Sequence, residues 1–153
     1  MSRHRTTRAI ITGAAVPGRT GVSLLARLRM ASGQLVTQAS ISSITYTVSN
    51  VSLGTALGAG TFTVSSSIYD ALQQNDVRWA IDSAAEPGPD LTHGFNFLGT
   101  LGATLFSLAT LAAPGVLTGE ADAETMQCDV FFTPVSGQPF RVIYRWPALP
   151  VYG

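Results

Sequence analysis

Short segments in which apolar and polar residues alternate are the feature that most restricts the fold of this chain. Residues 41–48 (ISSITYTV) are rich in β-branched residues and place Ile44, Tyr46 and Val48 at every second position. Side chains on a strand point alternately to its two faces, so this period of two predicts a half-buried strand. Residues 22–30 alternate in the same way. The face expected to be buried there comprises Leu24, Ala26, Leu28 and Met30.

Further strand segments are separated by turn residues. Residues 126–133 and 140–146 flank a glycine-bearing loop at 134–139, an arrangement that predicts a β-hairpin. The other expected elements are strands at 61–64, 77–81 and 93–98, a strand end or short helical turn at 68–74, and loops at 54–60 and 83–92. About seven to eight short strands without a long amphipathic helix are typical of a β-sandwich. The predicted fold class is therefore all-β: an immunoglobulin-like antiparallel β-sandwich with an extended N-terminal arm.

The domain organisation expected from the sequence is simple. The chain has 153 residues, which suits one domain with one core. Residues 1–20 are basic and rich in threonine and glycine, and we expect them to form an N-terminal arm. Residues 21–153 are expected to form the sandwich, with 94–124 as an apolar loop or insertion region.

Charge is scarce and unevenly distributed. Only 12% of the residues are charged, and all nine basic residues are arginine. Low charge predicts a surface partly covered by partners, and arginine suits interfaces, although a GC-rich genome also replaces lysine by arginine. Residues 1–69 carry six arginines and no acid, whereas residues 70–153 carry three arginines and nine acids. This polarity favours docking of the basic arm on an acidic neighbour, unless strands of both halves interleave and cancel the charges.

An uncharged stretch runs from residue 94 to residue 119. It is long enough to span a bilayer, but its polar residues, Pro114 and the lack of a flanking basic cluster favour a buried strand, a loop and an interfacial apolar segment. We therefore expect that the protein has no membrane partner. We expect it to contact other proteins through the arm and this uncharged stretch. The residues expected at the interface are Arg3, Arg5, Arg8, Arg19, Leu101, Leu105, Phe106, Leu108 and Leu111.

Residues capable of catalysis are few. The chain has two histidines, His4 and His93, and a single cysteine, Cys128, which we expect to be buried and unreactive. These considerations predict a protein that is not an enzyme, with no metal and no cofactor. The basic arm can contact nucleic-acid phosphates, but it lacks interleaved aromatic residues, so protein docking is favoured and no specific nucleic acid is expected.

Two acidic stretches offer oxygen ligands of the kind that calcium prefers. Neither has the spacing of a known calcium loop, so solvated acidic loops or docking surfaces for arginines are favoured over a calcium site. The stretches comprise Asp82, Glu86 and Asp90, and Glu120, Asp122 and Glu124.

Four segments together have a family likeness: residues 39–49 (ASISSITYTVS), 77–79 (VRW), 94–97 (GFNF) and 130–140 (VFFTPVSGQPF). Over roughly residues 22–149 the chain resembles small immunoglobulin-like proteins encoded in bacteriophage and prophage virion-gene clusters, of the baseplate and head-decoration types. The stretch 101–124 is longer than the corresponding connection in such proteins. The resemblance implies a non-enzymatic virion protein, assembled in the bacterial host cytoplasm, that contacts other copies of itself and a major capsid or tail protein.

Two other functions are compatible with the residues. A carbohydrate- or host-surface-binding module is the alternative, with Trp79, Trp146 or Tyr152 as exposed aromatic residues that stack on sugars. Alternation places Trp79 inward and leaves Trp146 undecided. A sheet-based enzyme is the weaker option, because it needs clustered carboxylates in a pocket.

Overall fold

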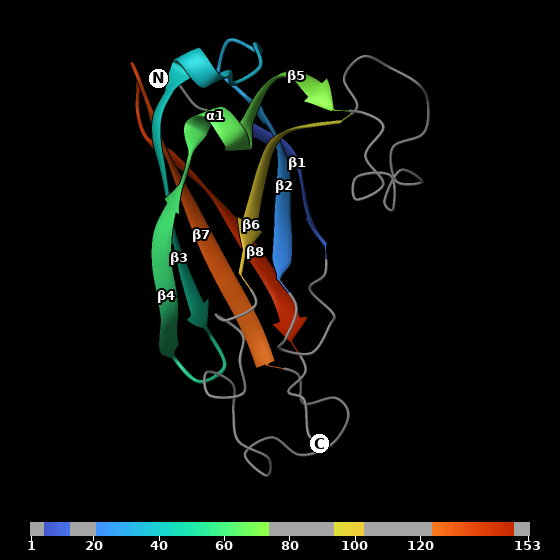
Figure 1. Ribbon diagram of the computed structural model, residues 1–153, viewed down its shortest axis with the longest axis vertical. Helices are drawn as coiled ribbons and strands as arrows, with labels where there is room; N and C mark the ends of the chain where they lie inside the picture. Colours follow the sequence, from blue (N-terminus) through green and yellow to red (C-terminus); the bar gives the residue numbers. More distant parts are fainter. Residues whose placement is uncertain (1–4, 13–20, 74–93, 103–123, 149–153) are drawn as a thin grey trace.

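Two antiparallel sheets facing each other make up the described part of the protein, residues 5–12, 21–73, 94–102 and 124–148 of a computed structural model (Figure 1). Sheet A has the strand order β1-β2-β6-β5, and sheet B has the order β4-β3-β7-β8. All pairings between neighbouring strands are antiparallel. The predicted all-β sandwich is confirmed, while its immunoglobulin-like character stays a prediction.

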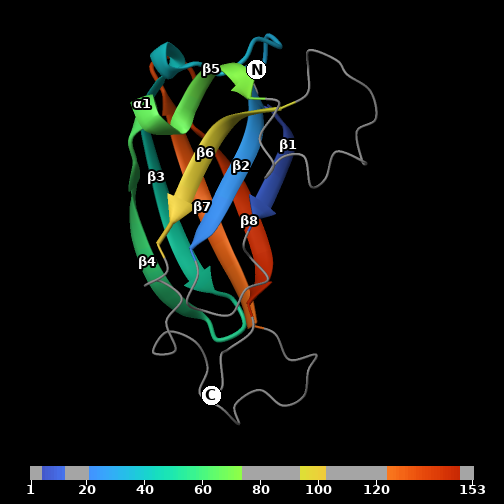
Figure 2. The same ribbon diagram turned by 45° about the vertical axis from the view of Figure 1, so that its right-hand side comes forward.

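Sheet A consists of β1 (Arg5–Thr12), β2 (Val22–Arg29), β6 (Phe95–Leu101) and β5 (Ile68–Gln73). Sheet B consists of β4 (Thr55–Phe62), β3 (Ile41–Asn50), β7 (Glu124–Pro134) and β8 (Phe140–Ala148). The turned view shows sheet A in front of sheet B (Figure 2). A 3-10 helix, η1 (Gln38–Ser40), precedes β3, and the short helix α1 (Val64–Ser67) carries the chain from β4 to β5.

The predicted strands over 22–30 and 41–48 and the hairpin of 126–146 are confirmed. Of the segment 68–74, for which a strand end and a short helical turn are both predicted, Ile68–Gln73 form the strand β5, and Gln74 lies outside the described residues. The predicted strand at 77–81 and loop at 83–92 lie outside the described residues.

Two expectations about local structure are wrong. Residues 55–60 were expected in a loop but belong to β4, because pairing with β3 imposes an extended backbone on alanines and glycines that have little strand preference of their own. Residues 5–12 were expected in an arm outside the sandwich but form β1, which pairs with β2 from Arg5↔Arg29 to Thr12↔Ser23. Pairing along a whole strand satisfies backbone groups that an arm leaves to water.

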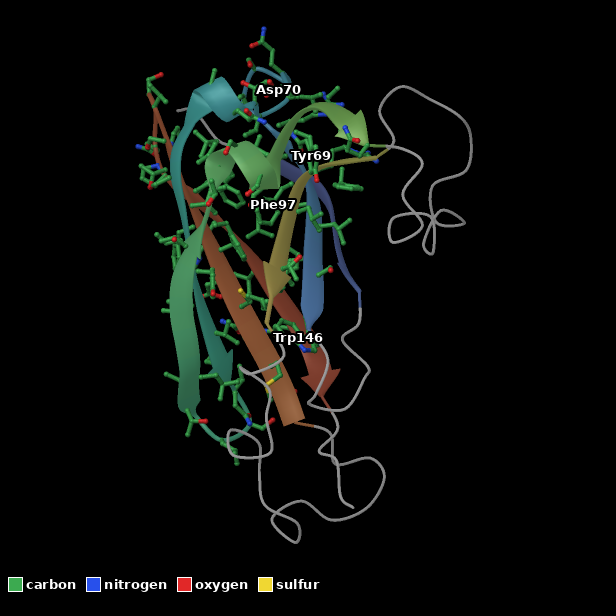
Figure 3. The ribbon with its side chains drawn as sticks, viewed as in Figure 1. Tyr69, Asp70, Phe97 and Trp146 are labelled. Atoms are coloured by element: carbon green, nitrogen blue, oxygen red, sulfur yellow. The ribbon has the colours of Figure 1, made fainter. Side chains whose placement is uncertain are left out.

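The core lies between the inner faces of the two sheets. Leu24, Ile44 and Val130 are buried there, as is Phe97, whose ring meets that of Phe132 edge to face at a centroid distance of 5.0 Å. Phe97 is labelled on the β6 side of the core in Figure 3. Such aromatic pairs contribute about 0.5–1.5 kcal/mol beyond the area they bury. The core therefore joins strands from the first, middle and last parts of the chain.

A buried tyrosine also links the sheets by a polar contact. The Tyr144 hydroxyl on β8 donates a hydrogen bond to the Leu25 carbonyl on β2, at 3.1 Å. Burial raises the pKa of Tyr144 well above its usual value, so the hydroxyl keeps the proton that it donates.

Asn96 takes the place of backbone pairing where β2 and β6 separate. Its Oδ1 accepts from the Leu28 N–H at 2.7 Å, and its Nδ2 donates to the carbonyls of Leu28 and Val36, both at 2.9 Å. The side chain is fully buried. Removing it would take the hydrogen-bond partner from the Leu28 N–H and the Val36 carbonyl, each at a cost of about 1–3 kcal/mol, while the Leu28 carbonyl would still accept from the Val36 N–H at 3.1 Å.

β2 is buried on both faces, and the half-buried strand predicted for it is therefore wrong in this respect. Leu25 packs with Phe95 on the face opposite the main core, against Tyr69 and Leu98. Arg27, on that same face, is only 5% exposed, and its Nε donates to the Gly94 carbonyl at 2.9 Å.

Candidate protein-binding edge

Of the nine residues predicted at an interface, the structure describes three. Arg5 and Arg8 lie on β1, opposite Arg29 and Arg27 of β2. Four of the six arginines of the N-terminal half are thereby gathered on two neighbouring strands. Leu101 is fully buried in the main core, so its prediction as a surface contact is wrong: β6 pairs with β2 and turns this side chain inward. The remaining six lie outside the described residues: Arg3, Arg19, Leu105, Phe106, Leu108 and Leu111.

The candidates for other functions are placed only in part. Trp146 is 4% exposed and buried against the core, toward the end of the sandwich opposite Tyr69 and Asp70 (Figure 3), so its ring cannot stack on a sugar. Trp79, Tyr152 and both histidines lie outside the described residues, as do the acidic residues from Asp82 to Asp122; Glu124 begins β7.

The single cysteine lies on β7, in the interior of sheet B. Cys128 is buried, as predicted, and desolvation, with the nearby charge of Asp129, raises its thiol pKa to about 12. Within the described ranges no three metal-ligating side chains come together, and no helix is long and apolar enough to cross a membrane.

The sheets end in four edge strands, and each edge strand has backbone N–H and C=O groups that its own sheet leaves unpaired. Proteins protect such edges with charges, prolines, bulges or covering segments, because an open edge pairs with other chains. The four edges therefore show where a strand of another protein can bind.

The β8 edge is protected by charge. Arg141 and Arg145 are exposed on it, and Pro147 near its end has no N–H to donate. Arg145 Nε donates to Gln127 Oε1 at 2.6 Å, and Gln127 Nε2 donates to Asp129 Oδ1 at 2.9 Å. Arg141 Nη1 lies 3.9 Å from Asp129 Oδ2, which makes a weak ion pair. An added strand would have to desolvate the two guanidinium groups.

The β5 edge is covered by η1. Gln38 Nε2 donates to the carbonyls of Ile68 at 2.9 Å and Ser65 at 3.3 Å, and the Gln38 backbone N–H donates to Asp70 Oδ1 at 2.8 Å. The side chain of Gln38 thus occupies one backbone acceptor of β5, the Ile68 carbonyl, and also binds to helix α1 through Ser65. The β1 edge carries Arg5 and Arg8, and its pairing is interrupted by a bulge between Thr6 and Arg8.

Among the residues that the structure describes, the β4 edge has none of these protections along most of its length. Its sequence, TALGAGTF, contains no charge and no proline, and Ala56, Ala59 and Thr61 are exposed. β4 is the last strand of sheet B, and no described strand pairs with its outer side (Figure 1). One bulge occurs: Val48 pairs with Gly58 and Ser49 with Ala56, which leaves Leu57 without a partner. The regular part of the open edge is therefore Gly58–Phe62.

Aromatic packing from behind stiffens this edge. Tyr46 of β3 lies over Gly60, where an added Cβ would come within 2.7 Å of the tyrosine hydroxyl. Tyr46 stacks on Phe62 at a centroid distance of 4.6 Å, and Phe62 meets Phe97 of the core at 5.9 Å. An aromatic ring over an edge glycine compensates for the missing side chain. The open edge is thus tied to the core, and Phe62 is itself only half-buried.

The chemistry that this edge offers is backbone hydrogen bonding to an extended peptide. Every second residue of an antiparallel edge strand points its N–H and C=O away from the sheet, and peptides add to such edges as a further strand. The alternation of apolar and polar residues does not reveal this edge, because its alanines and glycines show no period of two. The one available signal was the lack of charge between Arg29 and Asp70, which is not specific.

Comparison with protein-family models, with curated proteins and with solved structures finds no match to this chain. The described residues define its class: an all-β sandwich in which the β4 edge has no protective feature within the described ranges.

Proposed function

We infer that this chain is a non-enzymatic structural component of a phage-like virion, a capsid decoration or other head or tail accessory protein. It acts by protein–protein contacts made in many copies. The single observation that supports this best is the contrast among the edges. β1, β5 and β8 have charges, a bulge or a covering side chain, while Gly58–Phe62 of β4 has no such protection from the described residues.

An unprotected edge is a liability for a protein that stays alone, because it promotes aggregation. It is useful in a subunit whose neighbours are other proteins, since backbone pairing gives an ordered contact. The scarcity of charge agrees with a surface that neighbours cover. The sequence resemblance to immunoglobulin-like virion proteins supplies the type of assembly, and a major capsid or tail protein is then the second partner.

The test is to follow the chain into particles. Cells that encode the protein are induced to release phage-like particles, which are purified on a density gradient and examined by mass spectrometry and by antibody labelling in the electron microscope. We expect the chain to band with the particles in many copies and to label their surface. A chain found only in particle-free fractions, or one retained on immobilised glycans, would contradict the proposal.

A further inference from the structure

We propose that the open β4 edge binds a second copy of itself, so that two chains join their B sheets into one continuous eight-stranded sheet across a two-fold axis near Gly60. This inference rests on the proposed function, since it names one of the contacts that the subunit makes.

The first argument is steric fit in one register. A two-fold axis at Gly60 pairs Gly58 with Phe62 of the second copy on the inner face of the sheet, and Ala59 with Thr61 on the outer face. Each larger side chain then lies beside a smaller one, and Gly60 meets its own copy with no Cβ between the backbones. Side chains that lie directly opposite each other on two neighbouring strands are in contact, so the alternation of small and larger side chains makes this edge complementary to itself. The half-buried Phe62 ring would lose further contact with water.

Backbone hydrogen bonding is compatible with the same axis. Either the pair Ala59 and Thr61 or the set Gly58, Gly60 and Phe62 points its N–H and C=O outward, since outward groups alternate along an antiparallel strand. A two-fold axis at Gly60 brings outward groups of one copy opposite outward groups of the other in both cases. The bulge at Leu57 limits the contact to the regular residues Gly58–Phe62, so the dimer is weak alone and is favoured where copies are already held close together.

A second copy offers two edges of sheet B to β4, its own β4 and its β8, and the charges on these edges favour β4. Pairing β4 of one copy with β8 of the next is head-to-tail and leads to open filaments. It would desolvate Arg141 and Arg145, and β4 has no acid to compensate them. Pairing β4 with β4 buries no charge and gives a closed dimer. The uncharged edge therefore fits its own copy better than it fits β8.

The experiment introduces like charges on the outer face of β4. In the full chain, Ala59→Lys with Thr61→Lys places lysine opposite lysine at both ends of the proposed contact. The matched control is Thr45→Lys with Thr47→Lys: these threonines are exposed on the same face and pair with Thr61 and Ala59 from β3, one strand away from the edge. The mass in solution is measured by sedimentation equilibrium over a range of concentrations, and thermal unfolding verifies that each variant is folded.

We expect a monomer–dimer equilibrium for the native chain and for the control, and a dissociation constant raised at least about tenfold by the β4 lysines. A third variant, Ala59→Glu with Thr61→Glu, is expected to be monomeric alone and to form a heterodimer when mixed with the β4 lysine variant, because each lysine then faces a glutamate. Mixing keeps the register testable even where single variants are less stable.

Three results would overturn the proposal: a native chain that is monomeric at all concentrations, a dimer that the β4 lysines leave intact, or open-ended association. A monomeric native chain that nevertheless bands with particles refutes the β4 pairing and leaves the proposed function standing. A dimeric chain that never enters particles refutes the proposed function and leaves the pairing standing.

Discussion

The two edges of sheet B face the same solvent with opposite chemistry. β8 has two exposed arginines and is joined to β7 by a chain of polar contacts through Gln127 and Asp129. β4 has only small or neutral side chains and is fixed by aromatic rings behind it. Both strands are extended and both pair with an interior neighbour, so the difference is not one of fold. Within the described residues, one edge of the sheet has protective side chains and the other has none, and this contrast is the basis of the proposed contact at β4.

The largest effect is expected from a substitution that disturbs the aromatic support of β4. Gly60→Val places a branched side chain where an added Cβ would already lie 2.7 Å from the Tyr46 hydroxyl. Tyr46 must move off Phe62, and we expect a loss of about 1–3 kcal/mol in the free energy of unfolding, measured by urea denaturation.

The control for this change is Ala59→Val on the same strand. Ala59 is exposed on the outer face, so valine meets no core ring there and changes stability by less than about 0.5 kcal/mol. Equal losses for the two variants would mean that the β4 edge does not depend on its aromatic support.

A smaller effect is expected at the β5 edge. Gln38→Ala removes two hydrogen bonds to the Ile68 and Ser65 carbonyls, and we expect a loss of about 0.5–1.5 kcal/mol together with faster aggregation, followed by light scattering. Gln34→Ala, on the exposed turn before η1, is the control for a general loss of side-chain area. Aggregation that Gln38→Ala leaves unchanged would show that η1 does not protect this edge.

The sequence predicts some strands of this sheet and not others, and the reason lies in the pattern of side chains along each strand. Residues 41–48 predicted their strand because an amphipathic strand carries its own period. β4 was missed because Ala56, Gly58 and Ala59 have no period, and only pairing with β3 makes them extended. Leu101 was assigned to the surface because an uncharged run looks the same whether neighbours or the core cover it. An edge is a property of strand order in the sheet, which no local pattern contains.

A still smaller effect on stability is expected at β8. Replacing Arg141 and Arg145 by alanine removes exposed, weakly paired charges, so the free energy of unfolding changes by less than about 0.5 kcal/mol. We expect the variant to associate more strongly, because the β8 edge now resembles β4, and the association is measured by sedimentation velocity. A variant that associates no more than the native chain would remove the assigned protective role from these arginines.

Two predictions concern Cys128 on β7, between the two edges, and the first expects almost no change. Cys128 pairs with Val48 on one side and Tyr144 on the other, and its thiol pKa of about 12 keeps it protonated at pH 8. A thiol reagent should therefore react with it only when the sheet opens, at the same slow rate in the native chain and in the arginine variant. In the Gly60→Val variant, Cys128 should react faster with the reagent, because the sheet opens more often.

Stability should also fall as the pH rises above about 9, the ordinary value for the thiol. The unfolded chain then loses the Cys128 proton while the folded chain retains it, so ionisation favours unfolding. Below that pH both states hold the proton and Cys128 contributes no pH dependence. Denaturation at several alkaline pH values, with Cys128→Ala for comparison of slopes, measures its part.

The bond between Tyr144 and Leu25 has a consequence for the order of events during synthesis. The two residues are 119 positions apart, so the ribosome makes β2 long before the strand that fixes it to sheet B. Until β7 has been made, β3 can pair only with β4, and the other side of β3 stays open. Contacts so distant in sequence close slowly, and exposed strands invite wrong partners meanwhile. The hairpin of β3 and β4 is therefore the first part of sheet B available to a neighbouring copy, on the same polysome, before either chain has finished folding.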